Sequence, residues 1–402
     1  MPSFCFKPLT LTLAIAGALA AGVAQADTTL WGSARAAVQY VDIGDNPQGI
    51  NTDVPNYWDM VNPGTRIGFR GREELGGNLS AIWEYEFGVD NIEGGNFYSR
   101  TSWVGLLGGF GQLTVGRQYA PYYWMIGLPQ EIWQVDETAP GYFYLGLPKY
   151  ENNSIVYYSP VFFGPSRVGA ELGAGDPAGE IRPLGPIGMP IRNPGLQFGA
   201  AMVLQPMDQP DSPLPGDQTN SSGFDMWEAG AMYSQPPFFL NAAYRRFESN
   251  ITGVSANGSP VNFQGLIATA GSDVWGITGS YASGPFYAAL TYQSASVEQG
   301  SSTPGGSPYE VEFTGQYAIA PHTFRLGYSY VNTDGLTSGV TAPRQVSDIN
   351  TWMAGYQYNF SKRTWVFAEY RTSEFYGGYG QVSNRYFGYD YGVFSTGMRH
   401  EF

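Results

Sequence analysis

The chain has 402 residues and a formal net charge of −14, and 16% of its residues are aromatic while only 13% are charged. Such an acidic balance argues against nucleic acid as a partner, because phosphate binding needs clustered positive charge. The mean hydropathy of −0.21 is too low for a bundle of spanning helices, which would be far more apolar. Length alone would allow two or three domains, although a large β-barrel commonly exceeds that expectation as one domain.

The first 26 residues have the organisation of a secretory signal peptide. Lys7 is the only charge of a short n-region, the stretch 9–21 is mostly apolar, and Ala24-Gln25-Ala26 is a small-x-small cleavage site. The apolar stretch is too short for a spanning helix, and no later segment offers about 18 uninterrupted apolar residues. We therefore predict a signal peptide at 1–26 and a single domain at 27–402.

Segments of about ten residues with a period of two then recur along the chain. In the stretch 78–87 the aromatic residues share one parity and the two glutamates share the other. The stretches 286–292, 324–330 and 351–360 repeat this pattern, with aromatic residues at one or both ends. A tilted strand of this length crosses a bilayer with one face against lipid and the other against water. The recurrence therefore predicts an all-β fold, a transmembrane antiparallel β-barrel with aromatic girdles at its two interfaces.

The connections between these segments alternate in length. Short turns are expected at Gly76-Gly77, Gly108-Gly109, Gly164-Pro165, Pro236-Pro237, Ser283-Gly284-Pro285, Ala320-Pro321 and Ser361-Lys362. Long polar loops are expected near 42–64, 89–97, 120–152, 175–224, 249–272, 297–308, 332–347 and 375–387. Seven turns and eight loops give sixteen strands, with short periplasmic turns at one rim and long external loops at the other.

One part of the chain does not fit this count. The stretches 166–174 and 195–205 both resemble strands, but counting both gives an odd total. We therefore assign 195–205 either to the long Pro-rich fourth loop or to an extension of strand seven.

The last fifteen residues are typical of a closing strand. Met398, His400 and Phe402 share one parity, and Arg399 and Glu401 share the other. A soluble domain gains nothing from a final strand that ends on an exposed phenylalanine, whereas a barrel in lipid has hydrocarbon to cover that face. We therefore predict an outer-membrane barrel and assign Phe402 to its C-terminal membrane-insertion signal.

A set of short motifs points to a known family. The motifs are Thr29-Leu30-Trp31-Gly32, 66–71 with 73–76, 100–106, Gly116-Arg117-Gln118, Asn153-Ser154-Ile155 and Ser361-Lys362-Arg363-Thr364. Together they resemble the Gram-negative general porin family, especially its proteobacterial trimeric branch. The resemblance covers nearly the whole of 27–402 and is strongest in 28–118 and 350–402. The main departure is Val156, where many relatives have a basic residue.

The resemblance implies a homotrimer in the outer membrane, in contact with the lipid bilayer and lipopolysaccharide. It also implies a water-filled channel for passive diffusion of ions and small hydrophilic solutes, which a sixteen-stranded barrel is wide enough to enclose. In this family the third external loop folds into the lumen and narrows it. That loop is expected here at 120–152.

Alternation places several arginines on the water-facing parity of the first strands: Arg35, Arg66, Arg70, Arg72 and Arg100. Arg117 shares the phase of Leu113 and Val115, so only a bulge at Gly116 would turn it to the lumen. We predict that Arg35, Arg66, Arg70, Arg100 and Arg117 form the basic wall of the constriction. Three more arginines are expected on the far wall: Arg245, Arg325 and Arg371.

The third loop supplies Glu131, Asp136 and Glu137 as the predicted acidic side of the constriction. Arginines that face these carboxylates would set up a transverse field, which orients polar solutes and disfavours apolar ones. Alternatively, the arginines are only solvated, or they pair with Glu84 and Glu86 of the adjacent third strand.

The same loop is rich in aromatic residues: Tyr122, Tyr123, Trp124, Trp133, Tyr142, Phe143 and Tyr144. These rings could stack on sugars or other planar solutes, which would make the protein a substrate-selective channel with an aromatic-lined constriction. They could equally pack the loop against the barrel wall, where they bury large area. Packing is the interpretation we favour.

No cofactor, metal site or catalytic centre is predicted. An activated serine needs a base, yet one of the two histidines, His322, falls in a predicted periplasmic turn, and the other, His400, lies on the lipid-facing parity. The only cysteine, Cys5, lies in the predicted signal peptide, which excludes thiol chemistry from the rest of the chain. An enzyme is therefore disfavoured against a channel.

Overall fold

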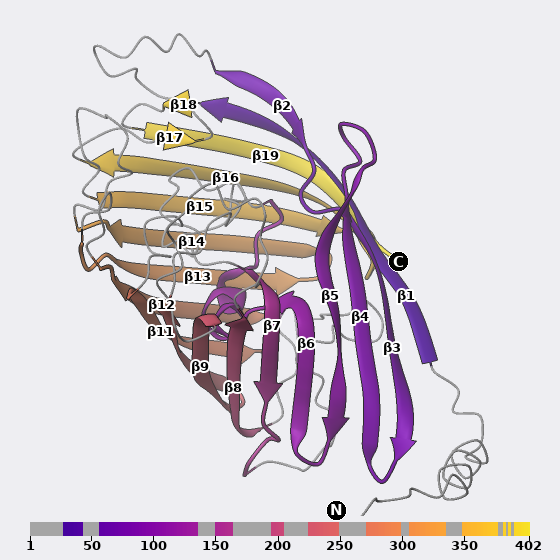
Figure 1. The fold of residues 1–402 in the computed structure, drawn as a ribbon. Coiled ribbons are helices and arrows are strands. Elements are labelled where there is room, and N and C mark those ends of the chain that lie inside the picture. The colour runs from indigo at the N-terminus through magenta and orange to yellow at the C-terminus, as the bar shows by residue number, and fades with distance from the viewer. Residues whose placement is uncertain are drawn as a thin grey trace, which may run out of the picture.

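The computed structural model describes residues 27–42, 56–135, 149–163, 194–204, 224–248, 271–298, 305–334, 348–376, 381–382, 385–386 and 390–402. Most of them lie in β-strands that curve around a common interior (Figure 1). Among these residues there is no helix with the length and apolarity that a membrane crossing requires.

The strands follow one another along the wall of the barrel. The first are β1 (Asp27–Asp42), β2 (Tyr57–Val61), β3 (Arg66–Gly76), β4 (Leu79–Val89), β5 (Phe97–Gly108), β6 (Gly111–Tyr119), β7 (Tyr150–Tyr158) and β8 (Gly195–Leu204). The others are β9 (Phe224–Gln235), β10 (Phe238–Phe247), β11 (Asp273–Ser283), β12 (Phe286–Ser296), β13 (Tyr309–Ile319), β14 (His322–Asn332), β15 (Asp348–Asn359), β16 (Thr364–Tyr376) and β19 (Asp390–Glu401). A separate two-stranded sheet contains β17 (Gln381–Val382) and β18 (Arg385–Tyr386).

The wall is closed, because each strand from β3 to β15 pairs antiparallel with the next, β19 pairs with both β16 and β1, and β1 pairs with β3. β2 and β3 both pair with β1 and act as two halves of one strand. Residues 62–65 interrupt that strand: Pro63 has no backbone N–H, Gly64 has φ +90°, and Asn62 Oδ1 accepts the next backbone N–H groups instead. The predicted sixteen-stranded barrel is thus confirmed, and β2 lies within the stretch predicted as the first long loop.

The two faces of the wall differ as strand alternation requires. Inward-facing side chains such as Glu228, Asn241 and Thr278 are polar and buried, whereas outward-facing ones such as Leu290 and Leu326 are apolar and more than half exposed. The outward band is flanked by aromatic pairs near the short turns and by others near the long loops. Near the turns these are Phe238–Tyr281, Phe286–Tyr317 and Phe324–Tyr356; near the loops they are Trp227–Tyr244, Trp275–Tyr292 and Tyr309–Tyr330.

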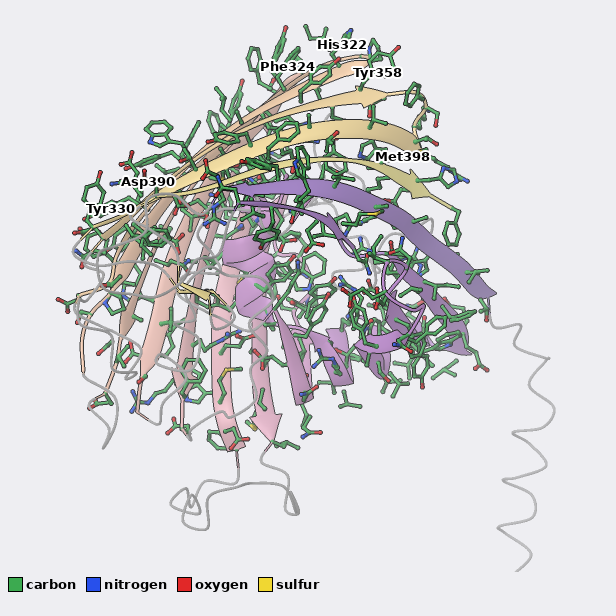
Figure 2. The ribbon with its side chains drawn as sticks, turned by 90° about the horizontal axis from the view of Figure 1, so that it is seen from above. His322, Phe324, Tyr330, Tyr358, Asp390 and Met398 are labelled. Atoms are coloured by element: carbon green, nitrogen blue, oxygen red, sulfur yellow. The ribbon has the colours of Figure 1, made fainter. Side chains whose placement is uncertain are left out.

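Figure 2 shows the two rims directly. His322, Phe324 and Tyr358 lie on the outside near one rim, and Tyr330 lies near the opposite rim. An apolar band between two aromatic girdles is the surface that an outer-membrane barrel presents to lipid. The described part of the chain therefore has the surface expected of a membrane-spanning barrel.

The fourth loop and the seventh strand were predicted wrongly. Residues 195–204 form β8, which pairs with β7 on one side and with β9 on the other, so this stretch is itself the seventh wall strand. Residues 159–194 therefore separate β7 from β8 in the sequence, and the predicted short turn at Gly164-Pro165 lies outside the described residues. The fourth loop shortens to 205–223. The competing stretch, 166–174, lies outside the described residues.

Hydrogen bonds explain why β8 belongs to the wall. Ser159 donates its backbone N–H to the carbonyl of Phe198 over 2.9 Å, and its hydroxyl accepts the N–H of Phe198 over 2.9 Å. Phe162 and Leu196 exchange two backbone hydrogen bonds of 2.8 Å. These contacts join residues almost 40 positions apart, and alternation within a single segment gives no information on them.

The C-terminal residue completes the closure of the barrel. The backbone N–H groups of Gly32 and Phe402 each donate to the other residue's carbonyl, both over 3.0 Å. The Phe402 ring lies so close to Gly32 that a Cβ on that glycine would collide with it. Met398, His400 and Phe402 face outward, and Arg399 and Glu401 are half-buried on the inner face.

Candidate functional site

Five strands around the β1–β19 closure point arginines into the barrel. Arg35 comes from β1, Arg66 and Arg70 from β3, Arg100 from β5 and Arg117 from β6. Arg399 of β19 stands directly opposite Arg35 in the register and joins the same set. We call these six residues the arginine wall.

One of the six reaches the inner face through a bulge in its own strand. The register shifts between Glu86 and Phe87 leave Arg100 as the extra residue of β5, so its position does not follow from the simple alternation on which its prediction rested. By that count it would share the outward parity of Val104; instead its Nε lies 2.6 Å from Glu86 Oε1.

Arg117 differs, because the register shift between Gly116 and Gln118 leaves two residues of β7, Asn152 and Asn153, opposite Arg117 alone, so the extra residue lies on β7. Arg117 keeps the parity of Leu113 and Val115, and its guanidinium lies 5.2 Å from the ring centre of Tyr150, next to that of Arg100.

Carboxylates on the wall itself pair with these guanidinium groups. Glu86 lies 3.4 Å from Arg66 and 2.6 Å from Arg100, and Glu401 contacts Arg399 and lies 4.0 Å from Arg35. This agrees with the alternative interpretation in which the arginines pair with the third strand.

The predicted acidic side of the constriction is arranged differently. Glu131 pairs with Lys149 over 2.6 Å, within its own loop, and no described contact joins it to an arginine. Asp136 and Glu137 lie outside the described residues.

Aromatic rings fix the orientation of four of the arginines. Arg66 and Arg70 lie 5.9 and 5.7 Å from the ring centre of Trp31, and Arg100 and Arg117 lie 5.3 and 5.2 Å from that of Tyr150. Such cation–π contacts are worth about 0.5–2 kcal/mol each, depending on desolvation. The guanidinium groups are therefore held rather than free to rotate.

The described part of the third loop, residues 120–135, lies against the inner face of the opposite wall. We call it the inner segment. It contains a π-helix, η1 (Tyr123–Gly127), and a 3₁₀-helix, η2 (Leu128–Gln130), whose first turn includes Pro129. Figure 2 shows these helical turns enclosed by the strands. Nearly all residues of the segment are buried.

Hydrogen bonds tie the inner segment to strands from β9 to β16. They join Tyr122 N to Glu228 (3.3 Å), Asn241 to Met125 O (2.9 Å), Tyr287 to Pro129 O (2.6 Å), Gln130 to Thr291 (2.8 Å), Gln134 N to Glu369 (2.9 Å) and Trp365 to Gln134 (3.0 Å). Each contributes about 0.5–1.5 kcal/mol net, and burying Met125 or Ile126 adds about 1.5–3 kcal/mol. Because the sum far exceeds thermal energy, the segment stays on this wall.

The aromatic residues of the inner segment pack rather than face open space. Tyr122, Tyr123, Trp124 and Trp133 are all at most 9% exposed, which agrees with the packing interpretation. Burial raises the pKa of the Tyr122 phenol well above its usual range, so the group stays neutral and donates to Gln293 over 3.2 Å. The other three rings, at 142–144, lie outside the described residues.

The far-wall arginines are buried in ion pairs. Arg245 lies 2.8 Å from Glu228 and 3.1 Å from Glu151, and Arg325 lies 3.5 Å from Glu369. Arg371 donates to Ser373 over 3.1 Å. Arg245 on β10 and Arg325 on β14 lie away from the arginine wall, whereas Arg371 lies on β16, directly beside β19.

Sequence reasoning missed three contributors to this interior. Arg399 was placed on the inner parity but left out of the basic wall, because its pairing with Arg35 depends on closure between the two ends of the chain. Glu401 and Lys149 were missed for the same reason, since their partners lie on other elements. Two charged residues, Arg399 and Glu401, share the inward parity of the last strand, and this pattern could have indicated Arg399.

Comparison with known proteins identifies the family. A family model described as Gram-negative porin matches residues 11–378. The chain belongs to the Gram-negative porin family. The sequences of two relatives align with this porin over most of their own length. The major outer membrane protein P.IB of Neisseria gonorrhoeae is 23% identical over 351 residues, 85% of this chain and 86% of that protein. The corresponding P.IA protein of Neisseria meningitidis serogroup B is 26% identical over 359 residues, 84% and 81% respectively.

Solved structures have the same fold. An anion-selective porin from Comamonas acidovorans is 18% identical with a TM-score of 0.57, covering 94% of this porin and 100% of that chain. OmpF of Salmonella typhi, in a complex with daunomycin, is 18% identical with a TM-score of 0.59 over 94% and 98%. OmpT of Vibrio cholerae, solved in a trimer form, is 14% identical with a TM-score of 0.56 over 94% and 99%.

Family membership decides the class of function and the location. The protein is an outer-membrane porin, which forms a passive channel, and its relatives are channels rather than enzymes. The predictions of the family, the barrel fold, the outer-membrane location and the passive channel are thereby confirmed. The neighbours of this fold include a trimeric form.

Proposed function

We propose that ions and small hydrophilic solutes cross this porin between the arginine wall and the inner segment, and that the passage favours anions. The observation that supports this is an imbalance of charge. Among the described side chains of the strands from β1 to β6 and of β19, the six guanidinium groups of the arginine wall face four inward carboxylates, Asp59, Glu84, Glu86 and Glu401, apart from the Arg72–Glu74 pair beside a turn.

The direction of selectivity follows from distance. Charges act over about 8 Å at physiological salt, so the nearest fixed charges dominate the field that an ion meets at a narrow point. On the far wall, the inward carboxylates Glu228 and Glu369 are paired with Arg245 and Arg325. The anion-selective Comamonas porin has the same fold, in line with this proposal.

The third loop acts here as the constriction. The inner segment occupies the interior next to β9–β16, so solutes are left with the part of the lumen beside the arginine wall. Because four of its rings are buried, we do not propose an aromatic track for selected solutes. Glu131, Asp136 and Glu137 remain candidates for the acidic side.

Swelling of proteoliposomes tests passive diffusion against selective uptake. Uptake rates should fall smoothly with solute size and should not differ between stereoisomeric sugars of equal size. A preference for one stereoisomer would instead support a selective channel, and no swelling at all would contradict a channel.

The assembly and the absence of catalysis are parts of the same proposal. The porin works as a homotrimer in a bilayer with lipopolysaccharide, which chemical cross-linking of the folded protein in native membranes would detect as a three-chain product. It catalyses no reaction and uses no cofactor. In support, His322 and His400 lie on the outer face, where their rings hydrogen-bond Tyr356 and Thr364 over 2.8 Å.

A further inference from the structure

Inward-facing glycines line the wall under the inner segment. They are Gly199 of β8, Gly230 of β9, Gly276 of β11, Gly327 of β14 and Gly355 of β15, and we call them the docking glycines. Each of them lies against a side chain of the inner segment. The glycines come from five separate strands, spread over 157 positions of the sequence, and meet one continuous stretch of 12 residues, Tyr122–Trp133.

The contacts leave no room for a side chain on the wall. A Cβ at Gly276 would lie 2.8 Å from the Tyr122 hydroxyl and 3.0 Å from Ile126 Cγ2. A Cβ at Gly199 would lie 2.7 Å from Met125 Cε, and the same methionine would collide with a Cβ at Gly230. These distances are shorter than ordinary van der Waals contact, so an added Cβ requires a neighbour to move. The end of the Met125 side chain can move by rotation, whereas the Tyr122 ring and the branched Ile126 side chain at Gly276 have less freedom, so the inner segment itself should shift there.

Trp133 makes the corresponding contacts at the other end of the segment. A Cβ at Gly327 would lie 2.7 Å from Trp133 Cζ2, and one at Gly355 would lie 3.3 Å from Trp133 Cζ3. The two ends of the segment are thus docked on strands on opposite sides of β12 and β13.

The backbone does not require glycine at these positions. None of the five is among the residues with positive φ, so any residue type could adopt their conformation. Glycine also weakens a strand, because it brings no side chain to pack and loses more entropy on folding. For Gly230 a close carbonyl, that of Ala242, is a second reason for glycine. At Gly276 the three nearest atoms all belong to the inner segment, whereas Gly199, Gly327 and Gly355 each also lie against a side chain of the wall, that of Tyr158, Met353 and Glu369 respectively.

We propose that the docking glycines are positioning residues that set the width of the channel. By letting the inner segment lie directly on the far wall, they leave the lumen beside the arginine wall open. The inference rests on the proposed function, because it assumes that solutes pass through that remaining space.

The test compares two glycines of one strand in planar bilayers. Gly276→Val adds bulk under the inner segment and should push it toward the arginine wall, which lowers the single-channel conductance. Gly279→Val is the matched control: it lies three residues away on the outward face with nothing within 4 Å of its Cβ, and its conductance should equal that of the wild type.

A compensating change separates displacement from general damage. Ile126→Ala in the Gly276→Val background removes two of the three nearest atoms that the valine meets, leaving the Tyr122 hydroxyl, and should restore part of the lost conductance. If Gly276→Val fails to fold, Gly276→Ala with and without Ile126→Ala takes its place under the same criterion. Gly327→Ala with and without Trp133→Phe repeats the test at the other end.

The outcomes test the role of the docking glycines separately from the proposed function. Wild-type channels that conduct, together with a Gly276 variant of unchanged conductance, would overturn the role of the docking glycines alone. A lowered conductance that Ile126→Ala does not restore would also overturn it. A wild-type protein that folds and passes no current would overturn the proposed function itself.

Discussion

Among single residues, the inward-facing charges differ most in how deeply they are buried. Arg245 and Glu228 have 0% and 1% of their side chains exposed, and the backbone N–H of Tyr122 also donates to Glu228. Arg72 and Glu74 form their pair with 36% and 63% exposed. Removing one partner of a buried pair leaves an uncompensated charge, whereas an exposed pair contributes little.

This contrast gives a prediction for stability. Glu228→Gln should lower the free energy of unfolding by about 3 kcal/mol, because Arg245 loses the carboxylate that lies 2.8 Å from it. Glu74→Gln should lower it by no more than about 1 kcal/mol. Urea titrations of the refolded barrel in detergent would measure both, and equal effects would contradict the assignment of Glu228 as a buried anchor.

A second residue-scale prediction concerns Gly32. Gly32→Val should disturb the docking of the C-terminal ring, since even a Cβ collides with Phe402, and overpacking of this kind costs about 1–3 kcal/mol. The readout is refolding yield and urea midpoint in detergent. Adding Phe402→Ala should recover part of the loss; a single variant as stable as wild type would refute the contact.

The positions of individual arginines were only partly predictable. The inward orientation of Arg35, Arg66 and Arg70 follows from the two-residue alternation, because β1 and β3 are paired in a regular register at these positions. Arg100 faces inward by a bulge that its own strand does not reveal, since the shift is defined against Glu86 and Phe87 of the partner. The predicted bulge at Gly116 does not lie on β6, because the extra residue of that register shift belongs to β7.

Among whole elements, the barrel depends on strands whose pairing is distant in sequence. β8 follows β7 only after 36 intervening residues, yet hydrogen-bonds to it as the turn-linked strands do to theirs. The turn residues in the sequence predicted the six hairpins that join neighbouring strands, five of which contain Gly or Pro. It could not choose between 166–174 and 195–205, because both are short and apolar and the choice depends on partners.

The role of β8 in the wall leads to a third prediction. Ala200→Pro removes a ladder hydrogen bond from a strand paired on both sides, which a central strand does not tolerate. The barrel should then fail to reach its compact, heat-modifiable form on gel electrophoresis. Ala200→Val should fold normally, because this position faces outward. Normal folding of the proline variant would show that the wall does not need β8.

The inner segment was predictable as a loop but not in its path. Its aromatic content indicated packing, which fits the burial of Tyr122, Tyr123, Trp124 and Trp133. Its hydrogen-bond partners lie up to 235 positions away, at Glu369, and no local pattern encodes such contacts. The docking glycines were equally hidden, because a single glycine within a strand has several possible causes.

In the whole molecule, the chain divides into a predicted leader and a barrel that starts where the leader ends. β1 begins at Asp27, directly after the predicted cleavage site. We therefore expect the protein isolated from outer membranes to have Asp27 as its first residue, and Ala24→Arg to block processing by removing a small residue from the site. Intact-mass analysis of both proteins measures this, and a mature chain that begins elsewhere would refute the boundary.

In the complete barrel, the passage for solutes is bounded by the closed wall, the inner segment and the arginine wall. Sixteen strands leave room for an aqueous lumen, the inner segment takes up the side next to β9–β16, and the arginine wall lines what remains. The net negative charge of the chain and the positive charge of this wall favour opposite ions. The ion that permeates more readily therefore reports which of the two controls the passage.

The most direct measurement is the reversal potential across a potassium chloride gradient, for the wild type and for Arg35→Gln/Arg66→Gln/Arg100→Gln. The wild type should give the sign of an anion-preferring channel, and the triple variant should shift clearly toward cations, with a larger shift at low salt because screening is weaker. A cation-preferring wild type whose reversal potential the triple variant leaves unchanged would contradict the arginine wall as the selectivity-determining part of the channel.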